Sequence, residues 1–131
     1  MQGHYHAVVW IDHRQARIFH FNASDADKLL IRPDDPARHL HHKANSIGSG
    51  HASEDRSFLE DVAKSVADAG AVLIVGPSNE KNELVKHIEQ THPQIAAKIE
   101  GVETVDHPTD GELVAYARKY LKSADLMRPQ I

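Results

Sequence analysis

The chain has 131 residues, no cysteine and a formal charge of -4 with its 11 histidines neutral. This length fits one domain, covering residues 1–131, which can bury roughly two thirds of its unfolded surface. The acidic balance argues against a protein that coats nucleic acid through its overall field, and the lack of cysteine excludes disulfides and thiolate metal sites. No apolar run approaches the roughly 20 residues that span a bilayer, and the N-terminus has no signal-peptide pattern. We therefore expect a cytoplasmic protein with no membrane partner.

The first part of the chain predicts antiparallel strands. A strand over residues 4–11 and an alternating strand over 16–21 form a hairpin. The turn residues 22–25 lead to a third short strand over 28–32, which Pro33 ends because proline has no N–H to donate to a neighbouring strand.

The rest of the chain alternates between helices and strands. Ser53 is predicted to cap a helix that Gly70 ends, and the uniformly apolar run 71–75 predicts a central strand covered on both faces. The remaining predicted elements are a helix with Leu84, Val85 and Ile88 on its buried side, a short helix over 93–99, a strand over 102–105, and a helix that begins with a capping box of Thr109 and Glu112.

These elements together predict an α/β fold. Three antiparallel strands are followed by α-β-α-β-α, which gives a mixed sheet of about five strands with helices packed on its faces.

Residues 36–51 are the most informative segment, because they carry four histidines, an arginine and a lysine without a carboxylate. A run of this length without hydrophobic periodicity predicts a functional or disordered loop. Unperturbed histidines titrate near ~6.5, so the positive charge of this loop should grow on mild acidification. Cations and flat rings can contact RNA phosphates and stack on its bases. The predicted RNA-binding residues are Arg38, His39, His41, His42, Lys43, Gly48, Gly50 and His51 in the loop, and Lys81 after the central strand.

Several motifs spread over nearly the whole chain match a known family in their spacing. They are Val8-Val9-Trp10-Ile11-Asp12, Ala16-Arg17-Ile18, His41-His42-Lys43, Gly48-Ser49-Gly50-His51, Ser57-Phe58-Leu59, Val72-Leu73-Ile74-Val75-Gly76-Pro77 with Lys81, and Gly101-Val102. With these motifs the chain resembles the middle domain of the eukaryotic and archaeal class I release factors and of Pelota. It is also similar to the small bacterial proteins labelled "translational machinery protein", and is identified as a member of that family.

The resemblance implies a ribonuclease-H-like fold and a function on the ribosome. In the release factors this loop carries Gly-Gly-Gln, which promotes hydrolysis of peptidyl-tRNA. Here Gly48 and Gly50 are followed by His51, and the loop contains no glutamine. Pelota-like domains also lack the tripeptide and still occupy the ribosomal A site. The resemblance therefore implies a ribosome-associated binder of rRNA or tRNA, acting in stalled-ribosome sensing, rescue or hibernation, with no catalysis and no cofactor of its own.

A metal-binding module is one alternative. Neutral imidazoles are ligands for Zn²⁺ and Ni²⁺, and a carboxylate from Asp34 or Asp35 could assist them. The candidate ligands are His39, His41, His42 and His51.

A metal-dependent nuclease or hydrolase is a second alternative. The ends of the first and last strands should deliver Asp12 and Asp106 to neighbouring positions, where Glu54 or Asp55 could complete a Mg²⁺ site for phosphodiester cleavage. Aspartates at these two positions also fit a turn and the approach to a helix.

Overall fold

The structure is a computed structural model that describes residues 5–33 and 50–127, with side chains described for 5–33 and 56–122. The elements, in chain order, are β1 (His6–Ile11), β2 (Ala16–Phe21), β3 (Ala26–Ile31), α1 (Gly50–Ser65), β4 (Ala71–Gly76), α2 (Glu80–Thr91), α3 (Pro93–Ala96), β5 (Ile99–Thr104) and α4 (Asp110–Met127). Within the described residues, no helix has the length and apolar character that crossing a membrane requires.

The strands form one mixed sheet in the order β3-β2-β1-β4-β5. β1 pairs antiparallel with β2 and parallel with β4, β2 pairs antiparallel with β3, and β4 pairs parallel with β5. This arrangement confirms the prediction of an α/β, ribonuclease-H-like mixed sheet of five strands.

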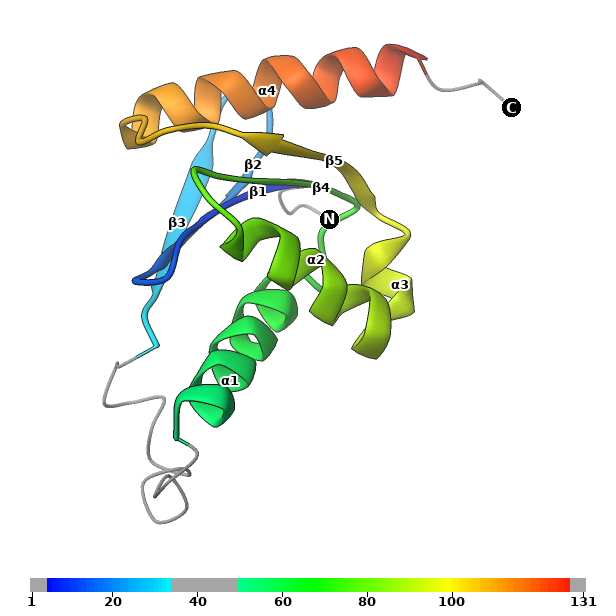
Figure 1. Cartoon of the computed structure of the whole chain (residues 1–131). Coiled ribbons are helices and arrows are strands. Elements are labelled where there is room, and N and C mark those ends of the chain that lie inside the picture. Colours follow the sequence, from blue (N-terminus) through cyan, green and yellow to red (C-terminus); the bar gives the residue numbers. More distant parts are fainter. Residues whose placement is uncertain (1–4, 34–49, 128–131) are drawn as a thin grey trace.

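Helices cover both faces of the sheet (Figure 1). Side chains alternate across a strand, so neighbouring residues of β1 enter different cores. Val9 and Ile11 pack with residues of α1, α2 and α3, whereas Val8 and Trp10 pack with residues of α4. All of β4 is buried, which confirms the prediction of a central strand covered on both faces, and residues 7–11 of β1 are buried in the same way.

Short polar turns connect the antiparallel strands. The Asp12 carboxylate accepts hydrogen bonds from the backbone N–H groups of Arg14 and Gln15, at 2.8 and 3.0 Å. The Asn22 side chain similarly accepts from the N–H groups of Ser24 and Asp25, at 3.0 and 2.9 Å. These contacts satisfy backbone donors that the strands leave unpaired.

The predicted capping box at the start of α4 is confirmed. The Thr109 N–H donates to the Glu112 carboxylate at 2.9 Å, and the Glu112 N–H donates to the Thr109 hydroxyl at 3.2 Å. The acidic first turn also suits the positive end of the helix dipole.

Several predicted boundaries were wrong. α1 begins at Gly50, so Ser53 lies inside the helix rather than at its cap, and serine tolerates a helix interior with little penalty. The same helix ends at Ser65, ahead of Gly70, because the N–H groups of Val66, Ala67 and Ala69 make tight turns with carbonyls three residues earlier. β3 and β5 begin earlier than predicted, at Ala26 and Ile99, because each is extended by pairing with its neighbouring strand.

Two glycines provide a matched test of the packing between β1 and β4. A Cβ on Gly76 would lie 2.3 Å from the backbone carbonyl oxygen of Ile11, whereas a Cβ on Gly111 in α4 would meet nothing within 4 Å. We expect Gly76→Ala to lower the free energy of unfolding by about 2 kcal/mol, because backbone must shift. Gly111→Ala should leave it unchanged or raise it by up to about 1 kcal/mol, because alanine favours a helix. Urea denaturation measures both, and equal effects would contradict this account.

Candidate nucleic-acid interface

Most of the RNA-binding residues predicted from the sequence lie outside the described residues. These are Arg38, His39, His41, His42, Lys43 and Gly48. Gly50 and His51 form the start of α1, where only the backbone is described. Their assignment to RNA, and the alternative assignment of the four histidines to a metal, stay predictions.

The elements on either side of segment 36–51 pack against each other. β3 ends at Ile31, α1 begins at Gly50, and residues of the two elements are in contact (Figure 1). Ile31 belongs to the same buried cluster as Phe58 and Leu59 of α1. The chain therefore leaves and re-enters the core through neighbouring elements.

Lys81 is the predicted contact whose side chain is described. It is 7% exposed, and its ammonium group donates to the Ser78 carbonyl at 2.6 Å. This bond braces the turn between β4 and α2. A contact of Lys81 with RNA stays a prediction.

The two aspartates predicted to meet at the strand ends, Asp12 and Asp106, each have a local partner instead. The Asp12 carboxylate is engaged in its own turn, while His13 Nδ1 lies 3.2 Å from the Glu80 carboxylate. Asp106 pairs through its carboxylate with its neighbour His107 at 2.7 Å. Among the described side chains, neither Asp12 nor Asp106 belongs to a group of three potential metal ligands within 4.8 Å.

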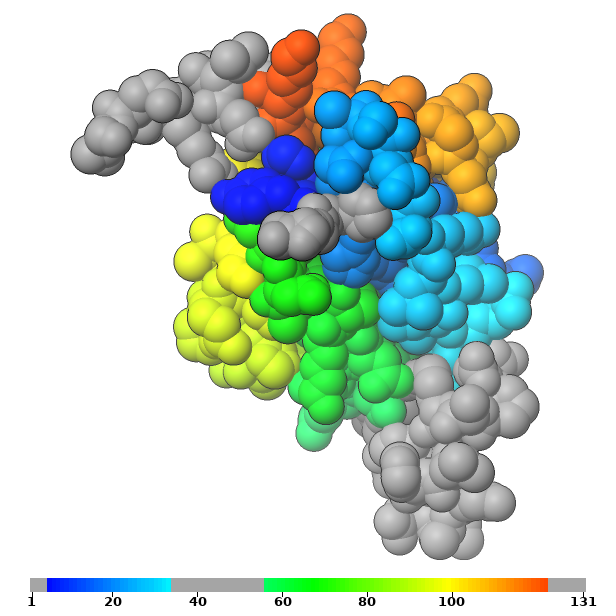
Figure 2. All heavy atoms as spheres, turned by 180° about the vertical axis from the view of Figure 1, so that it is seen from behind, coloured from blue at the N-terminus to red at the C-terminus, as the bar shows by residue number. Residues whose placement is uncertain are grey.

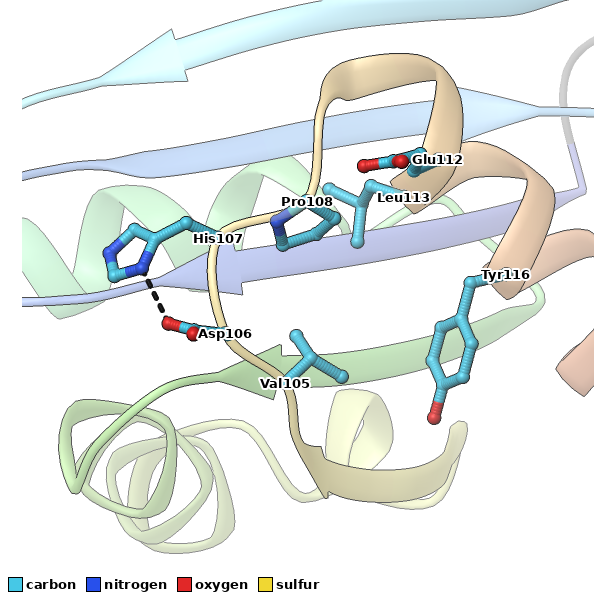
Figure 3. A pocket seen from close by; sticks show the side chains of 7 residues that line it. All are labelled: Val105, Asp106, His107, Pro108, Glu112, Leu113 and Tyr116. Carbon is cyan, nitrogen blue, oxygen red and sulfur yellow. Dashed lines mark hydrogen bonds and ion pairs between the residues drawn. The ribbon is translucent and has the colours of Figure 1, made fainter.

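A pocket of about 540 Å³ lies where β5 leads into α4. Figure 3 shows Asp106 and His107 on the connecting segment and Tyr116 on α4, with Val105 and Leu113 forming apolar walls. Burial and the neighbouring Glu103 carboxylate raise the pKa of the Tyr116 hydroxyl. Carboxylates of Asp106 and Glu112 also line the pocket, so its charge opposes binding of a phosphate group.

A second pocket, of about 650 Å³, has the opposite character. We call it the basic hollow. It is formed by the start of β1, the end of β2 with its following turn, and the outer face of α4. Figure 2 shows the turn after β2 beside α4. Its lining residues are His6, Phe21, Asn22, Ala23, Ala115, Arg118, Lys119 and Lys122.

Arg118 fixes one wall of the basic hollow. Its Nε donates to the Asn22 carbonyl at 2.9 Å and its Nη2 donates to the Asp25 carbonyl at 3.2 Å. The guanidinium carbon lies 5.9 Å from the centre of the Phe21 ring, within cation–π range. These contacts hold α4 against the β2–β3 turn.

The other cations of the basic hollow are directed to solvent. Lys119 and Lys122 are exposed, and neither has an ion-pair partner within the part of the chain that the structure describes. Beside them, His6 stacks on Phe21 with ring centres 5.7 Å apart, and the half-exposed Tyr5 meets His6 edge-on at 5.0 Å. The arrangement can place an anion beside the ring of His6, and a cationic groove beside flat rings is the combination that binding sites for single strands use.

The sequence reasoning missed this hollow. The cations at 118, 119 and 122 follow the spacing of one helix face, which is a usable signal. Nothing local indicates that the strand residues His6 and Phe21 lie beside them.

The N-terminal end of α4 is held by a separate charge cluster. The Asp110 carboxylate accepts from Arg17 Nη1 and from Lys28 Nζ, each at 2.8 Å. Arg17 also lies over the Trp10 ring, 4.6 Å from its centre. The Lys28 hydrogen bond, with help from Arg17, outweighs the effect of partial burial and holds the pKa of Asp110 below its ordinary value.

A further cluster joins α1 to the junction of α2 and α3. Glu60 Oε1 lies 2.7 Å from His87 Nε2 and 2.9 Å from His92 Nε2, and Glu60 Oε2 lies 3.0 Å from His92 Nε2. Partial burial acts to raise the pKa of Glu60, but the hydrogen bonds and charges of His87 and His92 outweigh it and lower that pKa. This is the group that brings three potential metal ligands together within the described residues, and the sequence reasoning did not identify it.

Solved structures of archaeal proteins share this fold. The chain is similar to Pelota of Archaeoglobus fulgidus, with 13% identity over 92% of this chain and 33% of that one and a TM-score of 0.64. It is also similar to the archaeal translation termination factor aRF1, with 14% identity, coverage of 93% and 38%, and a TM-score of 0.57. A third structure, described as an archaeal protein, has 13% identity, coverage of 92% and 38%, and a TM-score of 0.58.

The chain thus spans a third or slightly more of the length of each of these proteins. No protein-family model matches it, and neither does any curated protein sequence. The expected likeness to Pelota and the release factors is confirmed for the fold, and membership of the bacterial family stays a prediction.

The charge cluster at Asp110 predicts a pH-dependent contribution to stability. We expect Asp110→Asn to lower the free energy of unfolding by about 0.5 to 1 kcal/mol at neutral pH, as for partly exposed ion pairs. The pKa of Asp110 is lower in the folded protein than in the unfolded chain. Its stabilising contribution is therefore complete above the unfolded-state pKa of about 3.9 and is lost as the pH falls through the folded-state pKa. The difference between wild type and variant should therefore disappear in acid.

Denaturant unfolding along a descending pH series measures this effect. Asp68→Asn is the control, because that carboxylate is 93% exposed and lies 3.9 Å from its nearest partner, His20. A difference at Asp110 that persists unchanged in acid would contradict the assignment.

Proposed function

We propose that this protein is a ribosome-associated RNA-binding protein that holds rRNA or tRNA through the basic hollow and segment 36–51. The observation that carries the proposal is the basic hollow, which gathers Arg118, Lys119 and Lys122 beside stacked rings on a chain of net charge -4. A local cationic surface on an acidic protein binds a polyanion at that surface and repels it elsewhere. Such a distribution favours one orientation on RNA.

The chemistry of the hollow fits a nucleotide chain. Lys119 and Lys122 lie one turn apart along α4 and offer two ammonium groups to phosphates. The ring of His6, which lines the hollow and stacks on Phe21, provides a flat surface on which an unpaired base can stack. Arg118 is committed to the β2–β3 turn, so its role is to position the wall.

Segment 36–51 adds the second part of the proposed surface. Arg38 and Lys43 with the four histidines supply cations and rings, and Gly48 and Gly50 allow close approach of a backbone. The absence of glutamine from this segment leads us to propose binding without peptidyl-tRNA hydrolysis.

The fold favours translation as the setting. The similar structures include a protein described as a translation termination factor, and the likeness covers more than nine tenths of this chain. One fold can serve many functions, so the likeness in fold supports only the choice of rRNA or tRNA as the partner. The proposal that the chain binds RNA at all rests on the basic hollow. The proposed stage is the sensing, rescue or hibernation of stalled ribosomes in the cytoplasm.

Charge removal in the basic hollow tests the first contact. We expect Lys119→Gln combined with Lys122→Gln to weaken binding of single-stranded RNA and to reduce the slope of log K against log salt by roughly 1.5, because two phosphate contacts are lost. The matched control is Lys64→Gln with Lys86→Gln, which removes two exposed lysines from α1 and α2 on the other side of the sheet. Fluorescence anisotropy over a salt series measures both, and equal slopes would contradict the assignment.

Charge removal in segment 36–51 tests the second contact. We expect the combined variant Arg38→Ala, His41→Ala, His42→Ala and Lys43→Ala to lose co-sedimentation with purified bacterial ribosomes at low salt, because the segment loses most of its cations and rings. The same Lys64 and Lys86 control should still co-sediment, and the thermal transition should stay unchanged. Full co-sedimentation of the combined variant would refute a role for this segment.

A further inference from the structure

We propose that Glu60, His87 and His92 form a binding site for a divalent transition-metal ion of the zinc type. The site lies on the α1–α2–α3 side of the sheet, opposite the helix that carries the basic hollow. It is independent of the proposed function.

The three side chains already converge on one point. Both imidazole Nε2 atoms lie within 2.7 to 3.0 Å of carboxylate oxygens of Glu60, and one donor atom from each residue lies within 4.8 Å of the other two. Bonds of about 2.0 to 2.2 Å from a tetrahedral zinc ion place its ligand atoms roughly 3.3 to 3.6 Å apart. To admit the ion, each contact between an imidazole and Glu60 would open by roughly 0.3 to 0.9 Å, with the two imidazole nitrogens, which lie within 4.8 Å of each other, moving to a similar separation.

Two imidazoles on one carboxylate are the feature of this cluster, since the shared Asp110 carboxylate is paired with Arg17 and Lys28, which cannot ligate a metal as cations. Among the other ion pairs of the described side chains, His13 contacts Glu80 and His107 contacts Asp106. Here two rings meet the oxygens of Glu60 alone. A carboxylate can accept hydrogen bonds from two imidazoles, and the same three groups present the nitrogen and oxygen ligands that a divalent cation of this type uses.

The three residues of the site lie on, or directly between, helices that are packed into the core. Glu60 lies on α1 beside the buried Leu59, His87 lies on α2 beside the buried Ile88, and His92 is the residue between α2 and α3. Pro93 at the first position of α3 restricts the chain there. Ligands on packed helices hold a metal geometry more precisely than ligands on a loop.

The ligand types select the metal. Two imidazoles and one carboxylate suit Zn²⁺ and its neighbours, whereas Mg²⁺ requires oxygen ligands. The side chains of His87, His92 and Glu60 are 11%, 20% and 30% exposed, so an ion can enter and water can fill the fourth position. A bound ion would join α1 to the α2–α3 junction and raise the unfolding temperature by mass action.

The test must separate this site from the histidines of segment 36–51. A background variant carrying His39→Ala, His41→Ala, His42→Ala and His51→Ala leaves the cluster intact. We expect this protein to bind one equivalent of Zn²⁺ in competition with a chromophoric chelator, to give the visible absorption of tetrahedral Co²⁺, and to ignore Mg²⁺. Adding His87→Gln should weaken Zn²⁺ binding by more than the roughly 100-fold that loss of an outer-shell partner can cost.

The matched control adds His13→Gln to the same background, because His13 is 76% exposed and contacts a carboxylate, that of Glu80, outside the cluster. It should bind Zn²⁺ like the background protein. If His87→Gln fails to fold, Glu60→Gln replaces it, since this change keeps the side-chain size and a hydrogen-bond acceptor. The proposal is overturned if the background protein binds no Zn²⁺, or if the cluster variant binds it as tightly as the His13 control.

Discussion

The parallel pairing of β1 with β4 is the constraint on which the rest of the structure depends. Residues 7–11 and 71–76 are buried, so these two strands contribute to both cores at once. One core requires α4 as its cover, and the other requires α1, α2 and α3. The close approach of Gly76 to the Ile11 carbonyl shows how tightly the two strands are matched at their ends. The basic hollow and the cluster at Glu60 both include residues of helices that this pairing positions.

Placement of α4 then determines the basic hollow. Apolar packing of Leu113, Ala117 and Leu121 fixes which face of the helix is buried. Polar contacts at two points fix its position along the sheet, through Asp110 near β2 and β3 and through Arg118 near the β2–β3 turn. Lys119 and Lys122 are consequently left on the outer face beside the rings of β1 and β2. The hollow is thus a consequence of how the helix docks.

Local patterns allowed most of the fold to be predicted from the sequence, and distance along the chain explains what they missed. The hairpin, the apolar strand at 71–75 and the capping box of Thr109 and Glu112 each depend on neighbouring residues, and each was correct. The start of α1 was wrong because serine also tolerates a helix interior, and the helix extends past Ser53 to Gly50. The basic hollow brings together residues 96 apart, and the cluster at Glu60 joins residues 27 and 32 apart. No spacing rule reaches across such separations.

The distribution of charge shows why net charge alone describes this protein poorly. Arg17 and Lys28 are paired with Asp110, and Lys81 donates to a backbone carbonyl, so these cations serve the fold. The histidines at 87 and 92 are likewise directed at Glu60. Because a paired cation presents little field to a ligand, the charges that matter for recognition are those without such partners. In the described part of the chain Lys119 and Lys122 meet this condition, at a hollow that His6 and Phe21 also line, and for this reason an acidic protein can still present a local cationic surface.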